Sequence, residues 1–78
     1  MPTIEEINEI LNKHYTSNNG AHTALECHDG FIYMNLVRRS HLYPRQVATF
    51  LIRTFKEIDF ICYDDGMVYS RSTLENSR

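Results

Sequence analysis

The sequence predicts an α+β fold, a two-layer sandwich with element order α-β-β-α-β-β. Its four strands form one antiparallel sheet, and its two helices lie on one face of that sheet. Two dipeptides, Asp29-Gly30 and Asp65-Gly66, lie between runs of β-forming residues. Asp-Gly in this setting indicates a hairpin, because a type I′ turn needs positive φ at both central positions. A segment with helical spacing precedes each hairpin, and 78 residues suit one domain.

The first helix is expected from Thr3 to about residue 15. Thr3 followed by Glu6 three positions later forms a capping box, which marks a helix start. Ile7 and Leu11 belong to a narrow apolar stripe at helical spacing, while the other positions are polar. The run 18–20, Asn-Asn-Gly, ends the helix.

The first hairpin is expected over residues 22–37, with Asp29-Gly30 as a two-residue loop. This register places Cys27 opposite Ile32, Leu25 opposite Met34 and Thr23 opposite Leu36, and so gathers one apolar face. The other face is mixed and holds polar and aromatic side chains, namely His22, Ala24, Glu26, His28, Phe31, Tyr33, Asn35 and Val37.

The second helix begins at Pro44, where the missing N–H has no cost. Its apolar stripe is wider than that of the first helix, so we expect it to be more buried. The second hairpin is expected over residues 59–72, with Asp65-Gly66 as its two-residue loop. That register places Phe60, Cys62, Met67 and Tyr69 on one face, and Ile61, Tyr63 and Val68 on the other.

The domain is expected to occupy residues 1–72, and residues 73–78 to form a polar, frayed C-terminal tail. The N-terminal segment is acidic and lacks the basic and apolar regions of a signal peptide. No apolar run approaches the roughly 18 residues that span a bilayer. We therefore expect a cytoplasmic protein.

The chemistry-bearing residues favour a protein that is not an enzyme and has no metal or cofactor. Cys27 and Cys62 are expected to be small buried hydrophobes, with a cross-sheet disulfide as the open alternative. No metal-ligand spacing is found among His22, Cys27, His28, His41 and Cys62, and no nucleophile motif or phosphate loop occurs. Asp64 and Asp65 lie at a turn, where aspartate is favoured. A small enzyme remains the third hypothesis.

Charge is unevenly distributed along a chain of net charge −2. Five cations and no acid occur between residues 38 and 56, whereas acids dominate on both sides. One interpretation is an ordinary solvated helix face. The functional interpretation is a patch that docks an acidic partner or a nucleic-acid backbone. Its candidate residues are Arg38, Arg39, His41, Tyr43, Arg45, Arg53 and Lys56.

The first functional hypothesis is a small protein-interaction module that binds and regulates or inhibits a larger partner protein. A phage or mobile-element inhibitor of a host factor fits this description by size alone. Phe31, Tyr33 and Val37 on the outer sheet face suit a protein interface, where aromatic residues are enriched. Self-association as a homodimer belongs to the same hypothesis. The alternative is a nucleic-acid-binding domain that uses the basic patch.

Overall fold

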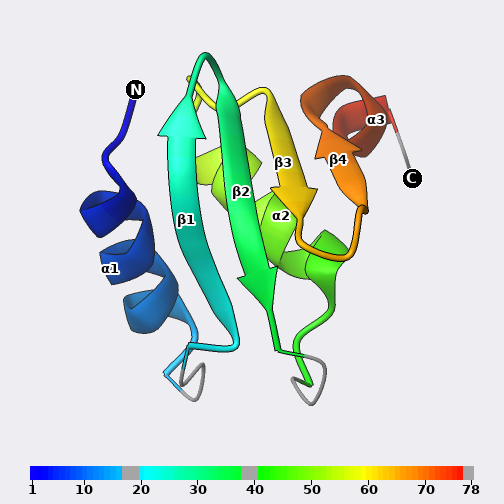
Figure 1. Ribbon diagram of the computed structural model, residues 1–78. Helices are drawn as coiled ribbons and strands as arrows, with labels where there is room; N and C mark the ends of the chain where they lie inside the picture. The colour runs from blue at the N-terminus through cyan, green and yellow to red at the C-terminus, as the bar shows by residue number, and fades with distance from the viewer. Residues whose placement is uncertain (17–19, 38–40, 77–78) are drawn as a thin grey trace.

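The computed structural model describes residues 1–16, 20–37 and 41–76. Seven elements follow one another along the chain (Figure 1): α1 (Ile4–His14), β1 (His22–His28), β2 (Phe31–Leu36), α2 (Pro44–Thr54), β3 (Phe60–Tyr63), β4 (Val68–Ser70) and α3 (Arg71–Asn76). The fold is therefore α+β, with one helix more than the sequence predicts.

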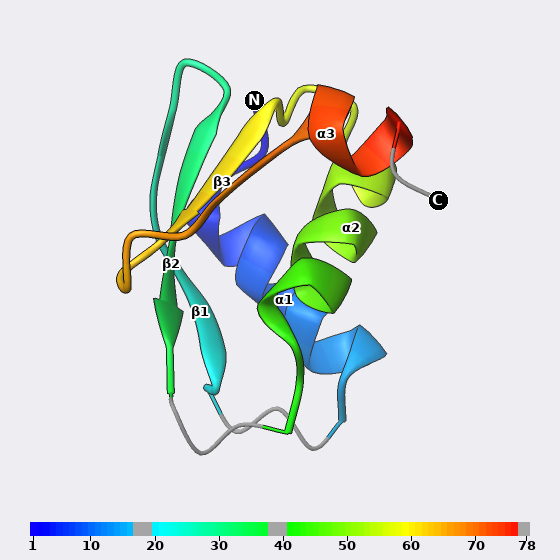
Figure 2. The same ribbon diagram turned by 90° about the vertical axis from the view of Figure 1, so that its right-hand side faces the viewer.

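The four strands form one sheet in the order β1-β2-β3-β4. α1 and α2 both lie on the same face of it, which leaves two layers (Figure 2). The prediction of a fully antiparallel sheet is wrong, because β2 and β3 run parallel. The cause is α2, which carries the chain back to the starting end of β2 before β3 begins. The carbonyl of Gly30 fixes this junction by accepting the N–H groups of Asp59 and Phe60 at 3.0 and 3.1 Å.

The first hairpin turns at Asp29-Gly30, as predicted. Both residues have positive φ, 49° and 80°, which a type I′ turn requires. The predicted pairs nearest the turn are also present, including Cys27 opposite Ile32. Beyond them a β-bulge at Leu25 shifts the register by one residue.

Because of the bulge, the predicted inner and outer faces of β1 are wrong for the residues that precede Leu25. Ala24 pairs with Met34 in place of Leu25, and His22 pairs with Leu36 in place of Thr23. Ala24 and His22 are consequently buried, whereas the Leu25 side chain is 54% exposed. A one-residue shift produces this exchange, because successive side chains of a strand point to opposite faces.

The second hairpin has a three-residue loop in place of the predicted two-residue loop. The Gly66 N–H donates to the Tyr63 carbonyl at 3.0 Å, and the Tyr63 N–H donates to the Met67 carbonyl at 2.8 Å. Gly66 alone adopts a positive φ, 91°, as the left-handed residue that ends such a loop. The register therefore moves by one residue, with Cys62 opposite Val68.

This second shift also exchanges the faces of one strand. Ile61 and Tyr63 of β3 are buried against the helices, and Tyr69 packs with them. Val68 lies on the outer face with Phe60 and Cys62, so the prediction that placed it with Ile61 and Tyr63 is wrong.

The helices form where the sequence predicts them. The Glu6 N–H donates to the Thr3 hydroxyl oxygen at 3.1 Å, so Thr3 is the N-cap of α1. α1 buries Ile7 and Leu11, whereas α2 buries four side chains, so α2 is the more buried helix. The core lies between these helices and the inner sheet face, and its largest fully buried members include Met34, Leu51 and Ile58.

In place of the tail predicted from residue 73, α3 extends to Asn76, and residues 77–78 lie outside the described part of the chain. Leu74 is buried in the core, which anchors this helix. The Arg71 guanidinium reaches the carbonyls at the end of α2, with Nη2 at 2.7 Å from Ile58 O and 2.9 Å from Ile52 O. Among the described residues, no helix is both long and apolar enough to cross a membrane.

Candidate functional site

The outer face of the sheet carries two rows of side chains that cross neighbouring strands. The first row runs from His28 through Phe31 to Phe60, and the two phenylalanine rings stack with centroids 4.9 Å apart. The second row runs from Glu26 through Tyr33 and Cys62 to Val68. Each row begins with a polar residue on β1 and is apolar on β2 and β3. We call Phe31, Tyr33, Phe60, Cys62 and Val68 the sheet-face patch.

The sheet-face patch is open to solvent. Tyr33 is 41% exposed, Phe60 37% and Val68 56%. Figure 2 shows α1, α2 and α3 on the opposite side of the sheet, so none of the helices in the described residues covers this face. Adjacent exposed aromatic and aliphatic side chains are typical of an interaction surface. Val37, the third sheet-face residue predicted from the sequence, is exposed just beyond the end of β2.

Carboxylates lie around this apolar area. Glu26 is the β1 neighbour of Tyr33, and Asp59 directly precedes Phe60. Three more aspartates, Asp29, Asp64 and Asp65, occupy the two hairpin turns at opposite ends of the sheet. We call these five residues the acidic rim. Glu26 lies 3.6 Å from His28 Nδ1 and Asp59 lies 4.0 Å from Arg71 Nε, whereas the three turn aspartates place negative charge at both ends of the sheet. Carboxylates at the edge of an apolar area favour a partner with the opposite charge at its edge.

The β1 edge of the sheet is partly closed. The Asn8 side chain on α1 accepts the Ala24 N–H at 2.9 Å and donates to the Ala24 carbonyl at 3.3 Å. The amide thus occupies backbone groups that a further strand would need for pairing. Strand β4 at the other edge has only three residues, which limits pairing there. The face of the sheet, not its edges, is therefore the larger available surface.

The two thiols lie on different sides of the sheet. Cys62 belongs to the sheet-face patch, whereas Cys27 lies on the inner side and donates to the Pro2 carbonyl with Sγ 3.2 Å from the oxygen. Both are free. Burial raises the pKa of each thiol, so both are protonated at neutral pH. The protonated form is a poor nucleophile.

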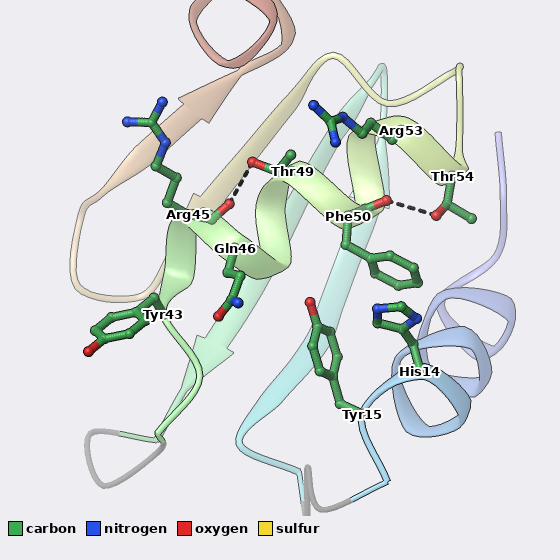
Figure 3. A pocket seen from close by; sticks show the side chains of 9 residues that line it. All are labelled: His14, Tyr15, Tyr43, Arg45, Gln46, Thr49, Phe50, Arg53 and Thr54. Atoms are coloured by element: carbon green, nitrogen blue, oxygen red, sulfur yellow. Dashed lines mark hydrogen bonds between the residues drawn. The ribbon is translucent and has the colours of Figure 1, made fainter. Parts of the chain in front are cut away.

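A second surface feature is a groove between the end of α1 and the exposed side of α2 (Figure 3), which we call the α1–α2 groove. Its volume is about 720 Å³. The Phe50 ring lies on the α1 side of the groove. The His14 ring stacks on it with ring centroids 3.9 Å apart, and the Tyr15 ring packs edge-on against it with ring centroids 5.7 Å apart. The groove is lined by His14, Tyr15, Tyr43, Arg45, Gln46, Thr49, Phe50, Arg53 and Thr54.

The structure brings together part of the predicted basic patch. Tyr43, Arg45 and Arg53 all line the α1–α2 groove. His41 and Lys56 are exposed but do not line it, and Arg38 and Arg39 lie outside the described residues.

Sequence reasoning missed the contributions of His14, Tyr15 and Phe50 to this groove, because their helical spacing assigns them to the core. It missed Val68 in the sheet-face patch because a two-residue loop turns that side chain inward. No local signal in the sequence identifies either group, since one depends on helix packing and the other on loop length.

The paired aspartates at the second turn have structural roles. An Asp64 carboxylate oxygen accepts the Leu36 N–H at 3.3 Å, and an Asp65 oxygen accepts the Met67 N–H at 3.0 Å. In residues 1–16, 20–37 and 41–76, no group of three or more His, Cys, Asp and Glu side chains is placed to hold a metal ion.

Comparisons with known proteins leave this chain without an assigned family. No protein-family model matches it, and neither a curated protein nor a solved structure is significantly similar to it.

Proposed function

We propose that this chain is a protein-interaction module, not an enzyme, and that it binds a larger partner protein through the sheet-face patch. Binding there would regulate or inhibit the partner by occupying its surface. The observation that carries the proposal is the apolar area formed by Tyr33, Phe60 and Val68 on an uncovered sheet face. Tyrosine and phenylalanine at the centre of such a surface contribute most to protein binding when they become desolvated.

The acidic rim defines the chemistry of the partner. A protein with an apolar centre and lysine or arginine around it would bury the patch and pair with these carboxylates. Because the rim is exposed, its contribution falls as salt screens it, and association slows. The same rim repels phosphate groups, so the nucleic-acid alternative is confined to the opposite, α1–α2 side of the molecule.

Charge also disfavours a second copy of this chain as the partner. A symmetric dimer joins identical surfaces, so a face-to-face dimer would bring two acidic rims together. Like charges at close range oppose association. A heterologous partner with a basic rim avoids this repulsion.

Two matched substitutions test the proposal. Tyr33→Ser removes an aromatic ring from the sheet-face patch, and Tyr43→Ser makes the same change at a ring that is 74% exposed beside α2. Affinity capture from the source cell, with bound proteins identified by mass spectrometry, should give a partner that Tyr33→Ser loses and Tyr43→Ser retains. For the purified partner, we expect Tyr33→Ser to weaken binding by at least about 30-fold, as for a central interface tyrosine.

Two results would contradict the proposal. Equal capture by wild type and Tyr33→Ser would mean that the patch is not the binding surface. Sedimentation that shows a stable dimer dissociated by Tyr33→Ser would assign the patch to self-association instead. Circular dichroism of both variants serves as the control for folding, because both side chains are exposed enough for little effect on stability.

A further inference from the structure

The lining of the α1–α2 groove is cationic. It includes two guanidinium groups, Arg45 and Arg53, and no carboxylate. An adjoining hollow of about 400 Å³ shares His14, Phe50 and Thr54 with it and adds the Lys13 ammonium. Cationic side chains thus come from both helices, in a chain whose net charge is −2. This distribution selects an anionic ligand.

Arg53 is available for such a ligand. Its side chain is exposed on the last turn of α2, and no ion pair within the described part of the chain involves its guanidinium. Arg45 lies eight residues earlier on the same side of α2 (Figure 3), which is about 12 Å along the helix. A guanidinium group donates two parallel N–H bonds to a phosphate, so a guanidinium group at either end of the groove is suited to hold an anion.

The lower part of the groove offers rings and an amide. In Figure 3 the Gln46 side chain extends from α2 between the rings of Tyr43 and Tyr15. An exposed tyrosine ring provides a surface on which a planar base stacks. The glutamine amide carries a donor and an acceptor on one edge, the pattern that pairs with the edge of a nucleobase.

The two threonines of the lining cannot serve as extra donors. The Thr49 hydroxyl donates to the Arg45 carbonyl at 2.8 Å, and the Thr54 hydroxyl donates to the Phe50 carbonyl at 2.7 Å. Their protons are therefore used within α2. Donors to a bound anion must come from the arginine and amide side chains. In Figure 3 both guanidinium groups extend upward from α2, whereas the tyrosine rings and the Gln46 amide lie below it, so a ligand that contacts both sides needs a charge at one end and a ring at the other.

We propose that the α1–α2 groove binds a nucleotide unit, with the base against Tyr43, Gln46 and Tyr15 and the phosphate at Arg53. Its volume lies within the range of small-molecule sites. The same unit exists as a free nucleotide and within a single-stranded nucleic acid. This site lies on the opposite layer from the sheet-face patch and does not depend on a protein partner (Figure 2).

Titration of the isotope-labelled protein with adenosine monophosphate, followed by NMR, tests the proposal. Backbone shifts should change at residues 43–54 and 14–15, and not on β2 and β3. Arg53→Gln and Tyr43→Ser should each weaken binding about tenfold, because each removes a main phosphate or stacking contact. Lys56→Gln removes the same charge as Arg53→Gln at an exposed position outside the groove, so its affinity should stay within about twofold of wild type.

Ligand fragments distinguish a nucleotide site from a simple anion site. Adenosine and inorganic phosphate should each bind more weakly than adenosine monophosphate. A short oligodeoxyadenylate that binds more tightly than the mononucleotide, with the same dependence on Arg53, identifies single strands as the source; equal affinity identifies the free nucleotide.

Three results would overturn the inference: no shift changes at millimolar adenosine monophosphate, equal affinity for phosphate alone, or equal losses in Arg53→Gln and Lys56→Gln. None of these would affect the proposed protein interface, whose test uses Tyr33.

Discussion

Arg71 is expected to hold the C-terminal helix onto the domain, and its replacement by methionine tests this directly. Nη2 lies within 3.2 Å of four carbonyl oxygens at the end of α2 and just beyond it, those of Ile52, Phe55, Lys56 and Ile58. The last carbonyls of a helix have no partner within the helix, and a cation there also interacts favourably with the helix dipole. Methionine keeps much of the aliphatic length but cannot donate.

The expected loss of unfolding free energy follows from the number of hydrogens on Arg71 Nη2. Nη2 carries two, so two of the four contacts are full hydrogen bonds at one time, and each charged bond contributes about 1.5–3 kcal/mol. The Arg71 side chain is 25% exposed, so water replaces part of the hydrogen-bond energy. The lower value of that range therefore applies to each of the two bonds. We expect Arg71→Met to lower the free energy of unfolding by about 3 kcal/mol. For a domain of this size, the melting temperature then falls by about 12–24 °C.

Urea unfolding followed by far-ultraviolet circular dichroism measures this change. Lys56→Met removes a nearby exposed cation and should change stability by less than about 0.5 kcal/mol. Glu75→Gln removes the exposed ion pair with Arg71 Nη1 and should cost little. A loss of unfolding free energy below about 1 kcal/mol in Arg71→Met would show that Arg71 does not hold α3 in place, because water would then satisfy these carbonyls equally well.

Two further predictions concern β1. Deletion of Leu25 removes the bulge but preserves the pairing on both sides of it, so we expect a loss of about 1 kcal/mol in urea unfolding. Deletion of Asn35 from the regular strand β2 turns Leu36 from the inner to the outer face and should cost about 2 kcal/mol or more; similar losses in both deletions would contradict the bulge assignment. Burial lowers the pKa of His22 from 6.5, so the folded state keeps the ring neutral while the unfolded state takes up a proton below that pH. Stability should therefore fall as pH decreases below 6.5, and His22→Phe should flatten that dependence in urea unfolding measured at several pH values.

The local features of this fold are readable from the sequence, and the first turn shows why. Asp29-Gly30 has only one way to close the strands that flank it, and the turn has the predicted type. At the second turn Asp64 precedes Asp65-Gly66, so three turn-forming residues are available and two loop lengths are compatible with them. The longer loop forms, and a one-residue difference moves Val68 to the outer face.

The remaining differences arise from contacts between distant segments. The bulge at Leu25 lets Ala24 face the core, where the Asn8 side chain holds its backbone, and nothing near Leu25 in the sequence marks it. The parallel pairing of β2 with β3 depends on where α2 returns the chain. The outer-face positions of Phe31 and Tyr33 could be predicted, because both residues lie close to the first turn. The α1–α2 groove could not, because it exists only where two helices meet.

Site-specific photo-crosslinking tests the proposed function most directly. A benzophenone amino acid replaces Tyr33 in the sheet-face patch in one variant and Tyr43 beside α2 in the other, and both are irradiated in the source cell. We expect a single protein adduct at position 33, with the crosslinked peptide of the partner rich in apolar and basic residues, and no such adduct at position 43. The same protein adduct at position 43 with none at position 33 would contradict the proposed function.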